Sequence, residues 1–366
     1  MSYYGEKGKF SFRDNFCEET DISEMGELAD FGKIIGNIFR RIAVGTDILS
    51  RNPELSVLIG GIAKGGADIF VINEPVPVFR YGIKLSECDC GIYICGEEKL
   101  RFIFFDRYGI NMPESIMLKI YNAKSAENLK KSGKISYLYN MSLLYINSIR
   151  DSVAENFIGR AVISCGNRKI ADIWRNFFSS ETGDIVFQIS EDGSRVNCYS
   201  TDSGFISYER LVLAYALVLW EKGEKVILPY GFHYAGEELA ESMNARYEYS
   251  NESNHNDLYK QRFTFDSLFL CTALMNSTEN IQDTIRKIPP FYTARREIST
   301  DFCMRDSERT ILDSDGRIKI SRSGKNRISL AVQSMSMENS AELCGKWEKL
   351  ILKKTENKSD YKKSYL

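Results

Sequence analysis

The sequence predicts an α/β protein in which successive α/β units are followed by a small α+β domain. Through the first 290 residues, short apolar segments alternate with segments whose apolar residues recur at helical spacing. Such alternation is typical of sheets covered by helices. The last segment differs, because two apolar strands flank a charged turn and a helix follows. The predicted boundaries are 1–132, 133–199, 200–295 and 296–366.

The first unit is organised around the apolar segment 91–95, which ends in a small residue and a run of charge. This pattern is typical of a buried parallel strand. In open α/β sheets, ligand-binding and catalytic residues lie at the carboxyl ends of such strands. The other expected elements in order are a helix at 23–42, a strand at 42–44, a helix from Asn52 with proline in its first turn, a strand at 67–72, a helix at 78–85 and a return strand at 101–105.

The later units follow the same logic with shorter segments. Residues 113–158 are expected to be helical, with an interruption near 130–133 that connects two domains. The second unit has expected strands at 160–164, 184–189 and 196–199 and a helix at 170–178. The third has helices at 207–220, 236–243 and 266–275, a strand at 225–228 and a polar loop at 251–257. The last domain has strands at 317–321 and 327–333 and a helix at 339–352.

Composition excludes several classes of protein. The net charge of −2 over 366 residues gives no electrostatic reason to expect nucleic acid or an anionic membrane surface as a partner. No apolar run reaches the roughly 18–20 residues of a membrane span, and the first ten residues lack the apolar region of a signal peptide. Nine cysteines without paired spacing indicate reduced thiols and predict a cytoplasmic location.

Six segments, taken in one order, carry a resemblance. They are G-T-D-I-L-S-R-N-P-E at 45–54, G-I-Y-I-C-G-E-E-K-L at 91–100, R-A-V-I-S-C-G-N at 160–167, S-E-D-G-S-R at 190–195, P-F-Y-T-A-R-R-E at 290–297 and S-R-S-G-K-N-R at 321–327. In this order and spacing the chain resembles the α-D-phosphohexomutase family, the phosphoglucomutases and phosphomannomutases. The resemblance implies three phosphohexomutase-like α/β/α domains, the second one reduced in this chain, followed by a small α+β C-terminal domain that serves as a lid.

The resemblance also implies a chemistry. Such enzymes pass a phosphoryl group between a serine and the two ends of a hexose phosphate. The reaction needs a nucleophilic hydroxyl, a divalent metal that neutralises the transferring oxygens, sugar contacts and cations for the distal phosphate. Each of these requirements can be compared with the residues present here.

The position of the nucleophilic serine is occupied by Glu97, and Glu98 and Lys99 follow where the family has histidine and asparagine. Two interpretations remain open. Glu97 could form an acyl phosphate, since carboxylates act as nucleophiles. Alternatively, it is a fixed negative charge close to where a phosphoserine would be, and we then expect it to contact Lys99 or Arg195.

The three aspartate positions of the family's metal loop fall on Ser190, Asp192 and Ser194, with Arg195 retained. Because Mg²⁺ favours charged oxygen ligands, we expect no resident cofactor, and Mg²⁺ only if the chain is active. Composition favours the alternative, in which Asp192 and Gly193 form a turn. In the first domain Asp47 is retained, whereas the two arginine positions around it hold Thr46 and Leu49.

The best-preserved segment is the phosphate loop, whose backbone N–H groups and three cations suit an anion. Its residues are Arg322, Ser323, Gly324, Lys325, Asn326 and Arg327. A charged hairpin tip is the alternative.

We therefore predict an inactive relative with a binding or regulatory role. Its partner would be a sugar phosphate or another anion, or a protein such as an active paralogue. The alternative is an active hexose-phosphate mutase that uses a non-serine nucleophile.

Overall fold

The computed structural model describes residues 3–7, 10–13, 16–19, 25–96, 100–124, 131–155, 157–278, 281–300, 308–324 and 326–363. Over these ranges the chain is a mixed α/β protein with twelve α-helices and sheets of eight, four, two and four strands. Helices and strands alternate as the sequence predicts. The exact domain boundaries stay predictions.

The largest sheet has the strand order β1-β2-β3-β7-β6-β4-β5-β8. Its parallel part consists of β4 (Arg41–Gly45), β5 (Asp68–Val71), β6 (Cys90–Cys95) and β8 (Ile135–Tyr137). The return strand β7 (Arg101–Asp106) pairs antiparallel with β6 and leads to a meander of β3 (Phe16–Glu19), β2 (Phe10–Arg13) and β1 (Tyr3–Lys7). The predicted alternation around the buried segment 91–95 is thus confirmed.

Two helices of this unit cross at very close range. On α1 (Met25–Ile38) and α2 (Asn52–Gly65), glycines replace side chains along the line of contact. A Cβ atom placed on Gly61 would lie 2.2 Å from the carbonyl oxygen of Ala29, and one on Gly36 would lie 2.3 Å from that of Ile62. Backbone atoms cannot move aside as a side chain can, so these positions accept only glycine without a shift of the helices.

We expect Gly61→Ala to lower the free energy of unfolding by about 1–3 kcal/mol, because the added methyl group forces the helices apart. Gly60→Ala is the matched control, since a Cβ there would meet no atom within 4 Å. Alanine at that exposed helical position should leave stability unchanged or raise it by up to ~1 kcal/mol. Urea denaturation compares the two variants. Equal midpoints would contradict the close crossing.

The middle of the chain builds two smaller sheets. One has the order β12-β11-β10-β9, with β9 (Val162–Ser164) parallel to β10 (Ile185–Ile189) and β11 (Val196–Ser200) and β12 (Gly204–Ile206) antiparallel. The other pairs β13 (Val226–Leu228) with β14 (Tyr247–Tyr249). The helices here are α5 (Met141–Arg150), α6 (Arg168–Trp174), α7 (Tyr208–Glu221), α8 (Ala235–Ser242), α9 (His255–Gln261), α10 (Ser267–Ser277) and α11 (Ile281–Arg286).

A single hydrophobic core joins these sheets to the first unit. It includes Phe79 and Tyr93 from the first unit, Trp174 and Phe187 from the four-stranded sheet, and most of α7. The helix α3 (Val76–Leu85) contributes Phe79 and packs against α5. This shared core fixes α3 relative to the middle of the chain, and the site described below depends on that placement.

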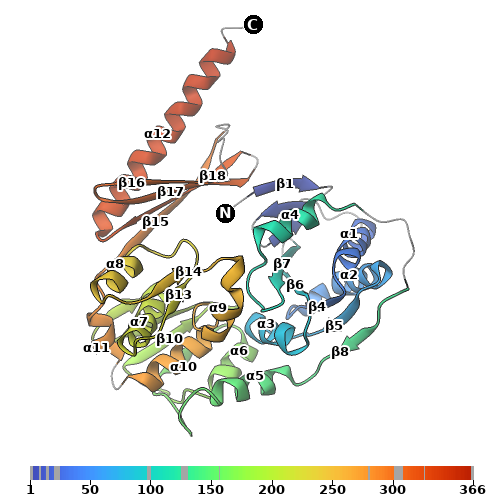
Figure 1. The fold of residues 1–366 in the computed structure, drawn as a ribbon, viewed down its shortest axis with the longest axis horizontal. Helices are drawn as coiled ribbons and strands as arrows, with labels where there is room; N and C mark the ends of the chain where they lie inside the picture. Colours follow the sequence, from blue (N-terminus) through green and yellow to red (C-terminus); the bar gives the residue numbers. More distant parts are fainter. Residues whose placement is uncertain are drawn as a thin grey trace.

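The final segment is an antiparallel sheet of order β15-β18-β17-β16 covered by one helix. Its elements are β15 (Tyr292–Ser299), β16 (Glu308–Asp313), β17 (Gly316–Gly324), β18 (Arg327–Ser334) and α12 (Met337–Lys363). Figure 1 shows α12 packing across the sheet and then extending well beyond it, and β17 lies beside β1. Among the described helices, none combines the length and apolar character needed to cross a lipid bilayer.

Several expectations from the sequence were wrong in detail. Residues 113–158 are not one interrupted helix, because β8 separates α4 (Glu114–Asn122) from α5. The expected polar loop at 251–257 contains a 3₁₀ turn, Glu252–Asn254, and the start of α9, since the side chain of Asn251 caps the turn. The sequence pattern does not predict β1–β3, β12, β14, β15, β16 and α11. These elements are short or largely exposed, so they lack the apolar periodicity from which helices and strands are predicted.

Candidate functional site

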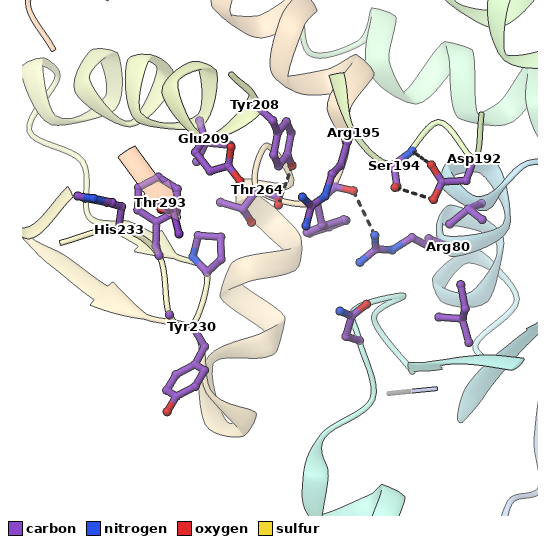
Figure 2. A pocket seen from close by; sticks show the side chains of 18 of the residues that line it. Arg80, Asp192, Ser194, Arg195, Tyr208, Glu209, Tyr230, His233, Thr264 and Thr293 are labelled. Atoms are coloured by element: carbon purple, nitrogen blue, oxygen red, sulfur yellow. Dashed lines mark hydrogen bonds between the residues drawn. The ribbon is translucent and has the colours of Figure 1, made fainter. Parts of the chain in front are cut away.

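A cavity of about 490 Å³ lies where the large sheet, the middle units and the C-terminal sheet meet. The residues that line it belong to α3, β7, the 190–195 loop, the start of α7, the 229–233 and 264–265 segments, and strands β15 and β18. Figure 2 shows lining side chains, Arg80, Asp192 and Arg195 among them. The charged and titratable side chains in this wall are Arg80, Asp192, Arg195, Tyr208, Glu209, Tyr230, His233 and Arg295. Residues far apart in the sequence therefore form one polar site.

The 190–195 loop closes on itself through its single aspartate. The Ser190 hydroxyl donates to Oδ1 of Asp192 at 2.6 Å, and the Ser194 hydroxyl donates to Oδ2 at 2.7 Å. The Ser194 N–H adds a further bond to Oδ1 at 3.0 Å. A buried neighbour, Ser267 at the start of α10, donates to the carbonyl of Gly193 at 2.7 Å. Both carboxylate oxygens of Asp192 are thus engaged inside the loop, which α10 holds in place.

Arg80 lies on α3 between two aromatic rings. Its guanidinium carbon is 5.0 Å from the ring centre of Phe105 and 4.9 Å from that of Phe265. Its Nε donates to the Gly109 carbonyl at 2.5 Å and its Nη1 to the Phe265 carbonyl at 3.3 Å. Burial lowers the pKa of this guanidinium, and nearby Tyr208 and Asp266 oppose that shift. Aromatic stacking and two carbonyls therefore fix the orientation of a largely dehydrated cation.

The imidazole of His233 is neutral at physiological pH. Burial lowers its pKa to about 4. Its Nδ1 accepts from the Ala235 N–H at 3.0 Å, so Nε2 carries the proton and faces the Tyr292 carbonyl at 3.2 Å. His233 therefore contributes no charge to the cavity and ties the 229–233 segment to β15.

An ion pair and a contact between a histidine and an aspartate connect elements around the cavity. Arg317 of β17 binds both carboxylate oxygens of Glu237 on α8, at 2.7 and 2.9 Å, which joins the C-terminal sheet to the middle of the chain. Nδ1 of His255 on α9 lies 2.7 Å from Oδ2 of Asp106 at the end of β7. These contacts connect the C-terminal sheet and the large sheet to the helices α8 and α9 of the middle units.

No protein-family model and no curated protein sequence matches this chain. Solved structures do match. A Thermus thermophilus protein assigned as a phosphomannomutase superposes with a TM-score of 0.69 at 13% identity, covering 96% of this chain and 100% of that one. A phosphoglucomutase/phosphomannomutase family protein from Burkholderia thailandensis gives 0.68 at 14%, covering 92% and 96%.

The chain has the phosphohexomutase fold. A third structure of this fold, N-acetylphosphoglucosamine mutase from Aspergillus fumigatus, matches with a TM-score of 0.52 at 10% identity, covering 86% of this chain and 76% of that one. That structure is a complex with glucose 1,6-bisphosphate. The resemblance found in six short segments is thus confirmed at the level of the fold.

Within the phosphohexomutase fold, the expected metal loop and its arginine lie in the cavity wall. Asp192, Ser194 and Arg195 line the cavity. Ser190 does not line it, but its hydroxyl donates a hydrogen bond to Asp192. A resident Mg²⁺ does not fit this donor set. The three metal positions hold one carboxylate, Asp192, and each of its oxygens accepts from a serine hydroxyl at a position where the family has another aspartate. Among the described residues, no group of three or more His, Cys, Asp or Glu side chains could hold a metal.

Asp47 lies beside this loop rather than in the cavity wall. Its Oδ2 accepts from the side-chain amide of Asn167 at 3.2 Å, and the same amide donates to the Glu191 carbonyl at 3.1 Å. Burial and Asp47 together raise the pKa of Tyr93 on β6. The retained aspartate therefore connects the first unit to the loop.

The expected nucleophile residues Glu97, Glu98 and Lys99 lie outside the described residues. The expected contact of Glu97 with Arg195 or Lys99 falls there too.

The expected phosphate loop lies at the tip of the β17–β18 hairpin, where Gly324 pairs with Arg327. The buried Ser323 hydroxyl donates to Oε2 of Glu297 on β15 at 2.5 Å, Arg322 is partly buried, and Asn326 and Arg327 are exposed. Lys325 is outside the described residues. The described members of this loop do not line the cavity.

Sequence reasoning missed Arg80 and Arg295 as cavity residues. Arg295 belongs to the segment 290–297, which contributes to the family resemblance only through its position in the order of segments. Arg80 lies outside the six segments that resemble the family. It lines the cavity because α3 packs against the middle of the chain.

Proposed function

We propose that this chain is a phosphohexomutase-fold protein that binds a phosphorylated sugar without transferring its phosphoryl group. The main support for the proposal is the 190–195 loop, which hydrogen bonds to Asp192 hold closed. Asp192 is the one carboxylate at the three family metal positions, and it is satisfied by Ser190 and Ser194. Transfer of a phosphoryl group requires neutralisation of its oxygens, for which these enzymes use the metal.

Retention of a ligand is supported by the charge of the cavity. Arg80, Arg195 and Arg295 line it, against the carboxylates of Asp192 and Glu209 and a neutral His233. A cavity of about 490 Å³ is within the range of small-molecule sites. A protein of the same fold is found in complex with glucose 1,6-bisphosphate, and we assign a ligand of this class to the present cavity.

A regulatory role would follow from binding without turnover. In that role the chain reports the level of a sugar phosphate to a protein partner, such as an active mutase, in the cytoplasm. The rival proposal is an active mutase with a non-serine nucleophile. Its candidate nucleophile, Glu97, lies outside the described residues.

Titration calorimetry with glucose 1,6-bisphosphate, followed by ³¹P NMR of the recovered ligand, tests this function. We expect saturable binding and a ligand that is recovered unchanged after incubation with Mg²⁺. Unphosphorylated glucose is the control and should not bind, because the cavity's charge would have no counterpart. Loss of either phosphoryl group from the bisphosphate would contradict the proposal.

A further inference from the structure

The described cavity wall contains three arginines, Arg80, Arg195 and Arg295, and two carboxylates, Asp192 and Glu209. Over the described ranges, no ion pair involves Arg80, Arg195 or Arg295, although eleven pairs of an arginine or lysine with a carboxylate form elsewhere. The nearby carboxylate of Asp192 already accepts hydrogen bonds on both oxygens. Arg195 and Arg295 are exposed, whereas Arg80 is half-buried. Because a half-buried guanidinium is costly without a paired anion, Arg80 favours an anion in the cavity.

Two of these arginines approach the same tyrosine. Arg80 and Arg195 both act on the hydroxyl of Tyr208, where their charges lower a pKa that burial raises strongly. The Tyr208 hydroxyl donates to the Thr264 carbonyl at 2.9 Å, so it stays protonated and is held in position. Figure 2 shows Arg80 and Arg195 entering the cavity from different elements, α3 and the 190–195 loop, with Tyr208 close to Arg195.

Arg80 differs from the other cations because it is held in place before any ligand arrives. The rings of Phe105 and Phe265 fix its plane, and its two hydrogen bonds to carbonyls use Nε and one side of Nη1. Among the described residues Nη2 of Arg80 has no hydrogen-bond acceptor, and Arg80 is part of the cavity wall. A guanidinium whose orientation is already fixed loses little side-chain entropy when it binds a planar or tetrahedral anion.

We infer that a phosphoryl group of the ligand sits between Arg80 and Arg195 beside Tyr208, and that it binds there without a divalent metal. The inference rests on the proposed function and names the side chains that carry it. The charge that balances the phosphoryl oxygens comes from two guanidinium groups, which bind phosphate through charge-assisted and often bidentate hydrogen bonds. Arg80 is thus a ligand-binding residue that the six family segments do not include.

Titration calorimetry with glucose 1,6-bisphosphate, in EDTA and separately in Mg²⁺, tests the inference. Arg80→Met and Arg195→Met should each weaken binding by about 10- to 100-fold, as expected for loss of a hydrogen bond to a charged group. The wild-type affinity should agree within about twofold between EDTA and Mg²⁺. Arg168→Met is the matched control, because that side chain is 92% exposed on α6 and should leave binding unchanged.

The variants also separate folding from binding. Arg195 is exposed, so its replacement should leave the melting temperature unchanged even if Arg80→Met is destabilised by loss of its aromatic packing. Wild-type protein that does not bind the bisphosphate would overturn the proposed function, and the inference with it. Wild-type binding that persists unchanged in both variants, or that requires Mg²⁺, would overturn only the inference.

Discussion

Replacing Asp266 with alanine is expected to cost about 3–5 kcal/mol of unfolding free energy, because it leaves a largely buried arginine without its counter-charge. Oδ2 of Asp266 accepts from Nε of Arg262 at 2.7 Å, and their side chains are 5% and 13% exposed. Oδ1 accepts from the Tyr145 hydroxyl at 2.7 Å and from the Phe269 N–H at 3.1 Å, where it caps α10. One carboxylate therefore joins α5, α9 and α10.

Urea denaturation measures this loss, with Asp257→Ala as the matched control. Asp257 pairs with Lys260 at 2.8 Å, but their side chains are 61% and 65% exposed, so its loss should cost at most about 1 kcal/mol. Asp266→Asn should give an intermediate cost, since it retains the helix cap and loses the charge. A cost for Asp266→Ala no larger than that of the control would show that the network does not stabilise the fold.

The second large effect concerns metal affinity. Wild-type protein should bind Mg²⁺ no tighter than about 1 mM, because one hydrogen-bonded carboxylate cannot compensate for dehydration of the ion. Ser190→Asp combined with Ser194→Asp should tighten binding at least about tenfold, or ~1.4 kcal/mol, since two hydroxyl donors become two carboxylates. The position of the loop should survive, because Ser267 holds it through the Gly193 carbonyl.

Calorimetry of the ligand-free proteins compares the two affinities. The single variant Asp192→Asn in the double-aspartate background is the control and should weaken Mg²⁺ again. Micromolar affinity in the wild type would show that the loop opens to take a metal despite its internal hydrogen bonds.

The strands and helices with strong apolar patterns were predictable from the sequence. Residues 91–95 form the buried strand β6, and α7 is apolar along nearly its whole length. The order of six short segments was enough to predict the fold. Strand β8 was missed because it is exposed throughout, so it lacks the alternation of buried and exposed side chains that marks a strand.

The candidate site was only partly predictable. The loss of metal ligands could be seen in the residues at 190–195, but the hydrogen bonds from Ser190 and Ser194 to Asp192 could not, since they depend on the loop's conformation. Arg80 could not be found from sequence at all. It is far from Asp192 along the chain and becomes a cavity residue only because α3 packs against the middle of the chain.

A steady-state assay of glucose 1-phosphate conversion to glucose 6-phosphate tests the central claim most directly. The assay contains Mg²⁺ and glucose 1,6-bisphosphate as activator, and an active phosphoglucomutase serves as the positive control. We predict no product above the protein-free background from the wild type, and none from Glu97→Ser, which restores a hydroxyl but not the metal ligands. Wild-type turnover at ordinary enzyme rates of about 1–1000 s⁻¹, abolished by Glu97→Ala, would contradict the account and establish an active mutase.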